Sequence, residues 1–179
     1  MFATAEPKKE IKSMRTNALI LRNGTDIDWH LFEKSLHDHF GVNAVTLDRS
    51  GARKTAENIV WANSLCALIK AHPDGAKKIC NRLLEILIQA VKTKKAYAMD
   101  ECAAGMNKIV FPIIQNEEVN GFINICGRPF SNTDRIYTDY IQKTIHADAE
   151  EIQKLLPTVT PIDPRTIKKM KHFVTSYAQ

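Results

Sequence analysis

The sequence has no long run of apolar residues. None of its apolar stretches reaches the roughly 18 residues that a membrane-spanning helix needs. The opening MFATAEPKKEIKSMR contains no hydrophobic region of the kind found in a secretory signal peptide. We therefore expect a cytosolic protein that makes no membrane contact. Thiols stay reduced in the cytosol, so the four cysteines predict packing, metal binding or redox chemistry rather than disulfides.

The sequence also lacks an arginine-rich helix with interleaved aromatic residues, a pattern typical of nucleic-acid binding. Its formal net charge of +5 is spread thinly along the chain. Lysines gather in PKKEIK, GAKK, KTKK and TIKKMK, mostly at the ends of predicted helices and near the termini. Solvated helix faces explain this distribution better than a DNA-binding surface does, so we predict no nucleic-acid partner.

No internal repeat divides the chain, and its 179 residues suit one domain. Residues 1–25 are polar and lack sustained periodicity apart from NALILR, which predicts a mostly flexible leader with one short ordered piece. Residues 26–179 form the predicted domain, including its C-terminal helices. The domain opens with a helix in DIDWHLFEKSLHDHF, where Asp26 or Asp28 is the expected N-cap and Gly41 follows the end.

Helical and extended patterns follow one another in the rest of the domain. The extended segments are VNAVTLDRSGA, AYAMDE, KIVFPII and EVNGFINIC, and the helical segments are residues 56–72, ended by His72-Pro73, and residues 75–95, 131–157 and 163–178. Asp74 is the expected cap of the second of these helices, and Ser131 or Asn132 that of the third. Pro112 cannot donate to a sheet, so it favours an edge position or a bulge. The short QNEE turn allows no parallel crossover, so we predict an α+β fold in which helices pack on a mostly antiparallel sheet.

The two faces of the last predicted strand differ in chemistry. Alternation places Val119, Gly121, Ile123 and Ile125 on one face, which is apolar. The other face receives Asn120, Phe122, Asn124 and Cys126. A solvent-exposed face does not need an aromatic ring, two amides and a thiol, whereas a ligand pocket does. We therefore expect a pocket on this second face.

The four cysteines allow two interpretations, both of which stay open. Cys66 and Cys80 lie on apolar helix faces, where a cysteine is usually a small hydrophobic core residue. Cys102 and Cys126 end neighbouring predicted strands, so all four thiols can converge, and a set of four thiolates suits zinc or an iron–sulfur cluster. Against the metal site, the chain has no C-x-x-C pair.

The sequence gives little support for a catalytic site. Asp100 and Glu101 are adjacent in a strand and point to opposite faces, so they do not serve one pocket as an acid and a base. The histidines His37, His39 and His146 lie on helices whose polar faces explain them. We therefore predict that the protein is not an enzyme.

Three stretches resemble the PocR-type sensory domain family: SLCALIKAHPDGAKKIC, then YAMDECAAGMNKIVFPIIQNEEVNGFINICGRPF, then KLLPTVTPIDPRTIKKMKHFVTSYA. The resemblance runs from about Phe32 to Ala178. It implies a PAS-like fold and the sensing of small molecules, short hydrocarbon derivatives such as diols among them. The sequence differs from the family pattern at Ala103, where histidine is frequent, and at Arg128, where glutamine is frequent. The positions it implicates are Cys66, Cys80, Cys102, Gly105, Pro112, Gly121 and Gly127.

We predict, on these grounds, a cytosolic stand-alone sensory domain that binds a small molecule between its sheet and its central helices. It would signal by helix or dimer rearrangement, through a separate partner or a homodimer. The expected pocket residues are Trp61, Cys66, Cys80, Tyr97, Cys102, Phe111, Phe122, Asn124, Cys126 and Arg128. The alternative is a redox or metal sensor in which an iron–sulfur cluster or zinc is held by Cys66, Cys80, Cys102 and Cys126. A third reading is an interaction domain whose pocket is filled by its own side chains.

Overall fold

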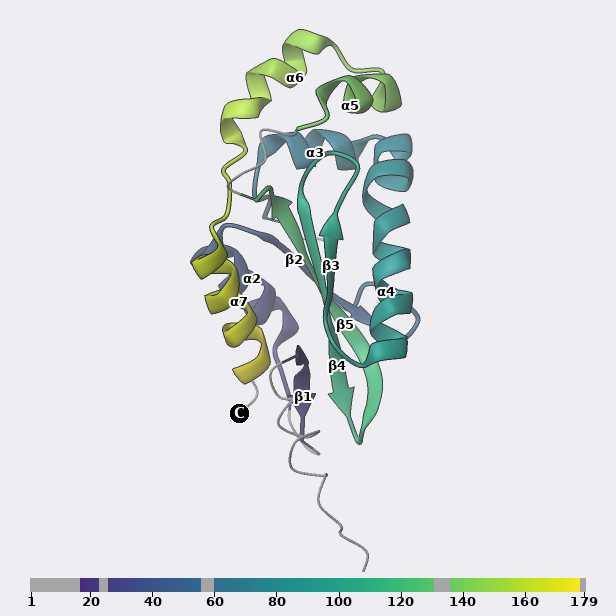
Figure 1. Cartoon of the computed structure of the whole chain (residues 1–179), viewed down its shortest axis with the longest axis vertical. Coiled ribbons are helices and arrows are strands. Elements are labelled where there is room, and N and C mark those ends of the chain that lie inside the picture. Colours follow the sequence, from purple (N-terminus) through teal and green to yellow (C-terminus); the bar gives the residue numbers. More distant parts are fainter. Residues whose placement is uncertain (1–16, 23–25, 56–59, 131–135, 178–179) are drawn as a thin grey trace, which may run out of the picture.

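A five-stranded sheet forms the centre of the molecule, with helices on both of its faces and across one end (Figure 1). The computed structural model describes residues 17–22, 26–55, 60–130 and 136–177. The flexible leader expected over residues 1–25 therefore lies mostly outside the described residues. The predicted α+β class is confirmed, since helices and a largely antiparallel sheet make up one structure.

The strand order is β1-β4-β5-β2, and β3 pairs with β4 beside β1. Every pair is antiparallel except β1 with β4. β1 comes from the expected leader, in its short ordered piece, so the sheet begins upstream of the domain start that we placed at residue 26. The strands are β1 (Leu19–Leu21), β2 (Asn43–Asp48), β3 (Ala98–Glu101), β4 (Asn107–Gln115) and β5 (Glu118–Arg128).

Pro112 lies in the middle of β4, at the point where β4 changes partner. β3 pairs with β4 up to Val110, and β1 pairs with it from Ile113 onward. The missing N–H of Pro112 therefore falls between the two partner strands, where no ladder bond is required of it. The nearby bulge between Ile113 and Ile114 also matches the expectation for this proline.

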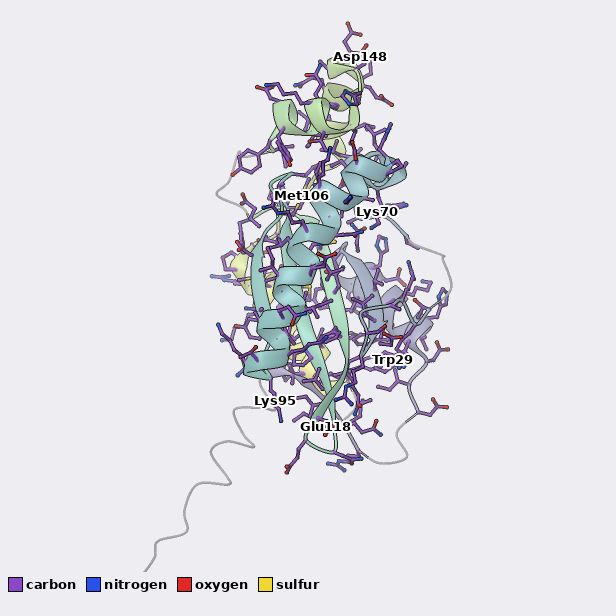
Figure 2. All side chains as sticks on the ribbon, turned by 90° about the vertical axis from the view of Figure 1, so that its right-hand side faces the viewer. Trp29, Lys70, Lys95, Met106, Glu118 and Asp148 are labelled. Carbon is purple, nitrogen blue, oxygen red and sulfur yellow. The ribbon has the colours of Figure 1, made fainter. Side chains whose placement is uncertain are left out.

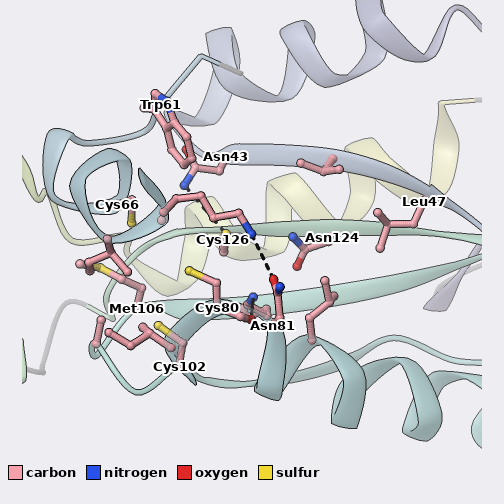
Figure 3. A pocket seen from close by; sticks show the side chains of 18 of the residues that line it. Asn43, Leu47, Trp61, Cys66, Cys80, Asn81, Cys102, Met106, Asn124 and Cys126 are labelled. Carbon is pink, nitrogen blue, oxygen red and sulfur yellow. Dashed lines mark hydrogen bonds between the residues drawn. The ribbon is translucent and has the colours of Figure 1, made fainter. Parts of the chain in front are cut away.

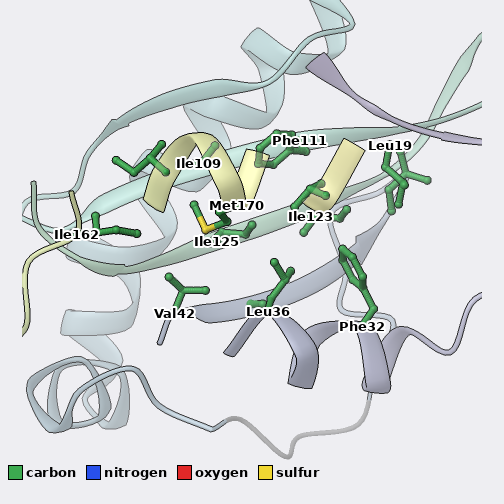
Figure 4. Packing of buried hydrophobic residues seen from close by; sticks show 14 residues of the cluster. Leu19, Phe32, Leu36, Val42, Ile109, Phe111, Ile123, Ile125, Ile162 and Met170 are labelled. Atoms are coloured by element: carbon green, nitrogen blue, oxygen red, sulfur yellow. The ribbon is translucent and has the colours of Figure 1, made fainter. Parts of the chain in front are cut away.

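One face of the sheet is covered by α2 (Trp29–Phe40) and α7 (Pro164–Ser176). Helix α2 begins as the sequence predicts, at Asp28, and α7 begins in the same way at Asp163. Both side chains accept hydrogen bonds from backbone N–H groups of the first turn. Their apolar sides pack on Ile123 and alternate residues of β4 and β5, as Figure 4 shows. This core includes Leu19, Phe32, Leu36, Val42, Ile109, Phe111, Ile123, Ile125, Ile162 and Met170.

The opposite face is covered by α4 (Arg82–Lys94), which packs Leu87, Ile88 and Val91 against Val110 and Phe122. The helix expected over residues 75–95 is continuous, but its first part, η1 (Gly75–Asn81), is a π-helix. The Asp74 side chain makes no capping hydrogen bond there and instead pairs with Lys78, so the predicted cap is wrong.

Helix α3 (Ser64–Ala71) is shorter than expected. The prediction of a helix from residue 56 is wrong at least over residues 60–63, because the Asn63 side chain accepts a hydrogen bond from the N–H of Cys66 and starts the helix there. The long helix expected over residues 131–157 is two helices, α5 (Thr138–Ile145) and α6 (Ala149–Leu155), followed by the 3-10 turn η2 (Leu156–Thr158). They separate at His146, whose φ is 53°. The caps expected at Ser131 or Asn132 lie outside the described residues.

Helices α3, α5 and α6 lie together across the end of the sheet where β3 turns into β4 (Figure 1). A second apolar cluster fills this end, with Leu65 and Ile69 from α3 and Ile141 from α5. Figure 2 shows Lys70 and Met106 at this end, with Asp148 beyond them, while Lys95 and Glu118 lie at the opposite end. None of the helices in the described ranges is long and apolar enough to cross a bilayer.

Candidate functional site

A cavity of about 320 Å³ lies between the sheet and the helices α3, η1 and α4. It opens on the sheet face that carries Asn124 and Cys126, which is the face where the sequence predicts a pocket (Figure 3). Side chains alternate along β5, so Ile123 and Ile125 point to the other face of the sheet and pack into the core there. The lining residues are Asn43, Val45, Leu47, Gly51, Arg53, Trp61, Cys66, Ile69, Lys70, Ile79, Cys80, Asn81, Leu84, Cys102, Ala104, Met106, Lys108, Asn124, Cys126 and Gly127.

All four cysteines line this one cavity, although each comes from a different element. Cys66 lies on α3, Cys80 on η1, Cys102 directly after β3, and Cys126 on β5. Figure 3 shows their sulfur atoms around the same space. Within the described ranges, however, no three side chains of His, Cys, Asp or Glu are placed to hold one metal ion. The structure therefore does not favour the metal alternative.

The buried thiols are held in their protonated form. Burial raises the pKa of Cys66, and raises the pKa of Cys80 to about 11. Burial also raises the pKa of Cys102 above its ordinary value. A metal ligand or a nucleophile must be a thiolate, so these three residues act at neutral pH as small, weakly polar surfaces of the cavity.

Amide side chains shape the polar part of the cavity. Asn43 accepts a hydrogen bond from the N–H of Ala62 through Oδ1, at 2.6 Å, which fixes the loop that carries Trp61. The Nδ2 of Asn43 lies 3.9 Å from the sulfur of Cys126. Asn124 is different, because its Oδ1 is buried and has no hydrogen-bond partner. A buried acceptor left unpaired in a cavity is a position where a ligand donor gains a hydrogen bond.

The close approach of β5 to the loop before α3 requires a glycine. Gly127 has a φ of 103°, and a Cβ there would lie 2.6 Å from Nδ2 of Asn43 and 2.8 Å from Cβ of Ala62. Its carbonyl accepts a hydrogen bond from Nδ2 of Asn63, the residue that caps α3. Gly127 therefore lets the strand and the start of α3 close one wall of the cavity.

Six of the ten predicted pocket residues line the cavity: Trp61, Cys66, Cys80, Cys102, Asn124 and Cys126. That they contact a ligand stays a prediction. The other four lie elsewhere, which corrects the expectation that all ten surround one space. Tyr97 and Phe111 belong to the core on the opposite face, where their ring centroids are 5.4 Å apart. Phe122 is fully buried under α4.

Arg128 lies at the end of β5 and points away from the cavity toward main-chain carbonyls. Its Nη1 donates to the carbonyl of Phe40 at 2.7 Å and its Nε to that of Thr160 at 3.0 Å. A third bond joins Nη2 to the carbonyl of Pro161. The guanidinium thus fastens the segment before α7 to the end of α2.

Sequence reasoning missed several lining residues, among them the lysines Lys70 and Lys108. Lys108 had a usable signal, because it is a charged residue inside the apolar strand KIVFPII. Alternation puts it on the same face as Val110 and opposite to Ile109. Lys70 and Asn81 carried no such signal, since lysine and asparagine in helices are usually solvent-exposed, and Met106 carried none, since a buried methionine is usually a core residue. No histidine, aspartate or glutamate of the described ranges lines the cavity.

A family model described as the sensory domain found in PocR matches residues 28–179. This match covers nearly the whole chain and includes every described element except β1. It confirms the resemblance inferred from the cysteine spacing and the hairpin. No curated protein matches the chain.

Proposed function

This chain belongs to the PocR sensory-domain family, and we propose that it senses a small molecule by binding it in the cavity between the sheet and the helices α3, η1 and α4. The observation that supports this best is a preformed, largely apolar cavity that holds a few convergent polar groups. Such a combination is typical of small-molecule sites. The unpartnered Oδ1 of Asn124 supplies an acceptor within it.

The size of the cavity favours a small ligand. Its volume of about 320 Å³ is near the lower end of the range of about 300–1,000 Å³ for ligand pockets. The isoleucines Ile69 and Ile79 and the protonated thiols supply apolar contacts on several sides. We propose a ligand with a short hydrocarbon body, contacted by Trp61, Cys66, Cys80, Cys102, Asn124 and Cys126.

The position of the cavity suggests how binding is passed on. Two of its walls, α3 and η1, also support α5 and α6, because Leu65 and Ile79 pack in one cluster with Ile141 and Ile152. A ligand that moves either wall must therefore move this pair of helices. We propose that α5 and α6 present the altered surface to a separate signalling partner or to a second copy of the chain, in the cytoplasm.

Ligand-dependent stabilisation of the whole chain tests this function. A panel of small diols, alcohols, carboxylates, amides and aromatic compounds is added, and the melting temperature is recorded. A ligand at 100 times its dissociation constant stabilises the folded state by about 2.7 kcal/mol, which a melting curve resolves. At least one compound is expected to raise the melting temperature.

A cavity-filling variant provides the control. Cys126→Met adds volume at the cavity wall and should abolish the response, whereas Ile86→Met, on a side chain that is 58% exposed, should leave it intact. A panel that stabilises neither protein, or one that stabilises both variants equally, would count against binding in this cavity.

A further inference from the structure

Lys108 is a buried cation in the wall of the cavity. It lies on β4, opposite Cys126 on β5, and only 3% of its surface is exposed. Its ammonium donates one hydrogen bond, to the carbonyl oxygen of Cys80 at 2.7 Å. An ammonium has three N–H donors, so this contact leaves two of them available. Lysine is almost never buried unless its charge is paired.

No carboxylate in the described parts of the chain pairs with this charge. Lys70, the second lysine at the cavity, donates to Oδ1 of Asn81 at 3.0 Å and forms no ion pair either. Arg53 is the third cation, and its charge is paired with that of Glu33, with 3.6 Å between Nη2 and Oε2. Among the described residues, the cavity wall thus contains two lysines without a counterion and no acidic side chain.

Two of the neighbouring thiols, those of Cys80 and Cys102, do not supply the missing negative charge. Burial raises the pKa of Cys80 and of Cys102, even though the positive charge of Lys108 acts in the opposite direction on both. These groups are therefore uncharged at neutral pH.

We propose that the ligand of this cavity is a small organic carboxylate whose anionic group is bound by Lys108, with Lys70 as the second cation. This inference rests on the proposed ligand-sensing function and names the chemical class of the ligand. The carboxylate accepts charge-assisted hydrogen bonds from the two free N–H donors of Lys108. The hydrocarbon body of the ligand then packs on Ile69, Ile79 and the thiols.

A carboxylate fits better than a larger oxyanion. The cavity is small and mostly apolar, and the described residues contribute two unpaired cations, so a single negative charge on a short chain matches both its volume and its charge. A phosphate ester shares the oxyanion chemistry but brings more charge and more bound water. The test therefore includes both.

The first experiment compares isosteric pairs on the wild-type chain, with affinities from isothermal titration calorimetry. The pairs are propionate with propionamide, butyrate with butyramide, and lactate with lactamide; 1-butanol, 1,2-propanediol and propyl phosphate complete the set. At least one carboxylate is expected to bind about tenfold or more tightly than its amide, because a hydrogen bond between charged groups is stronger than a neutral one. This comparison needs no variant.

The second experiment removes the charge. Lys108→Met keeps an unbranched side chain of similar length and should lower carboxylate affinity about tenfold or more while leaving amide affinity within about twofold. Lys77→Met is the matched control, because Lys77 lies on η1 but is exposed and does not line the cavity. It should bind every compound as the wild type does.

The outcomes separate the inference from the function on which it rests. Binding of the alcohol, the diol or an amide with no preference for carboxylates would overturn the anionic ligand and leave the sensing cavity in place. A response to propyl phosphate alone would overturn the carboxylate class. If neither these compounds nor the wider panel binds, the proposed function fails as well.

Discussion

The ammonium of Lys108 lies 2.7 Å from the carbonyl oxygen of Cys80, which joins β4 to the π-helical turn η1 across the cavity. One hydrogen bond to a neutral carbonyl does not compensate a buried charge, whose removal from water costs several kcal/mol. The burial of Lys108 is therefore expected to lower the stability of the ligand-free protein, which is consistent with the binding role that we propose for it.

We expect Lys108→Met to stabilise the ligand-free protein. Replacing an unpaired buried charge by an apolar side chain of similar length should raise the free energy of unfolding by about 1–2 kcal/mol, net of the lost hydrogen bond. Urea denaturation at neutral pH measures this, with Lys77→Met as the exposed control. A clear loss of stability in Lys108→Met would instead make Lys108 a structural residue.

The buried thiols predict a stability that falls at high pH. In the unfolded chain a cysteine has a pKa of about 9.0, whereas in the folded chain burial raises the pKa of Cys80 to about 11 and that of Cys66 in the same direction. As the pH rises above 9, the unfolded state loses these protons first, so the free energy of unfolding falls. Below the pKa of the unfolded chain, the thiols do not change the free energy of unfolding.

Cys66→Ala isolates one thiol in this pH dependence. Between pH 9 and pH 10, the variant should lose less free energy of unfolding than the wild type, by up to about 1.4 kcal/mol per pH unit. Urea titrations at pH 8, 9 and 10 give the slopes. Lysines titrate equally in both proteins, so equal slopes would show that the Cys66 thiol titrates alike in the folded and unfolded states.

Metal analysis decides the role of the thiols directly. Because no group of three suitable side chains is placed to share an ion in the described ranges, we expect protein purified without oxygen to hold neither stoichiometric zinc nor iron with acid-labile sulfide. A chelator should leave its melting temperature unchanged. Stoichiometric metal that is lost from Cys66→Ser would restore the redox or metal sensor.

Arg128 should matter for stability and not for binding. Arg128→Lys keeps the charge but loses the planar fork that reaches three carbonyls, so we expect a loss of about 1–3 kcal/mol in the free energy of unfolding. Arg49→Lys, at an exposed ion pair, should change it by less than about 0.5 kcal/mol. Loss of ligand affinity in Arg128→Lys with unchanged stability would return Arg128 to the binding site.

Gly75 should be required where η1 meets α3. A Cβ at this position would lie 2.2 Å from the carbonyl oxygen of Ile69 and 2.8 Å from Cγ2 of Ile145. Gly75→Ala should therefore cost about 1–3 kcal/mol, because well-packed elements must separate. Lys77→Ala, in the same turn, is the control. A neutral Gly75→Ala would show that α3 and η1 adjust freely.

The sequence predicted the fold well wherever local signals were complete. Helix α2 combines an acidic cap with a regular apolar stripe and begins at an expected aspartate, and α7 begins where the segment predicted over residues 163–178 does. The break between α5 and α6 escaped prediction because His146, neither glycine nor proline, takes a left-handed conformation. The π-helical turn escaped because its sequence has the same apolar stripe as an α-helix.

The sequence predicted which face of the sheet carries the cavity, but not the full set of residues that line it. Alternation along β5 correctly assigned Asn124 and Cys126 to a cavity side and Ile125 to the core. Phe111 was misplaced because its side depends on the register that pairs it with Ile123, which local patterns do not reveal. Long-range pairing also brings Lys108 beside Cys126, and with it the charge of the cavity.

The position of Pro112 has a consequence for how copies of this chain can associate. An additional strand docking along β4 would need a row of N–H and C=O groups, but β3 and β1 occupy the two ends of that edge, and the proline between them has no N–H. Where these two strands begin, the N–H of Tyr97 already donates to the carbonyl of Asn17. Strand addition is therefore blocked along β4 itself, so a second subunit that meets this side of the sheet must contact β1, β3 or the neighbouring helices instead.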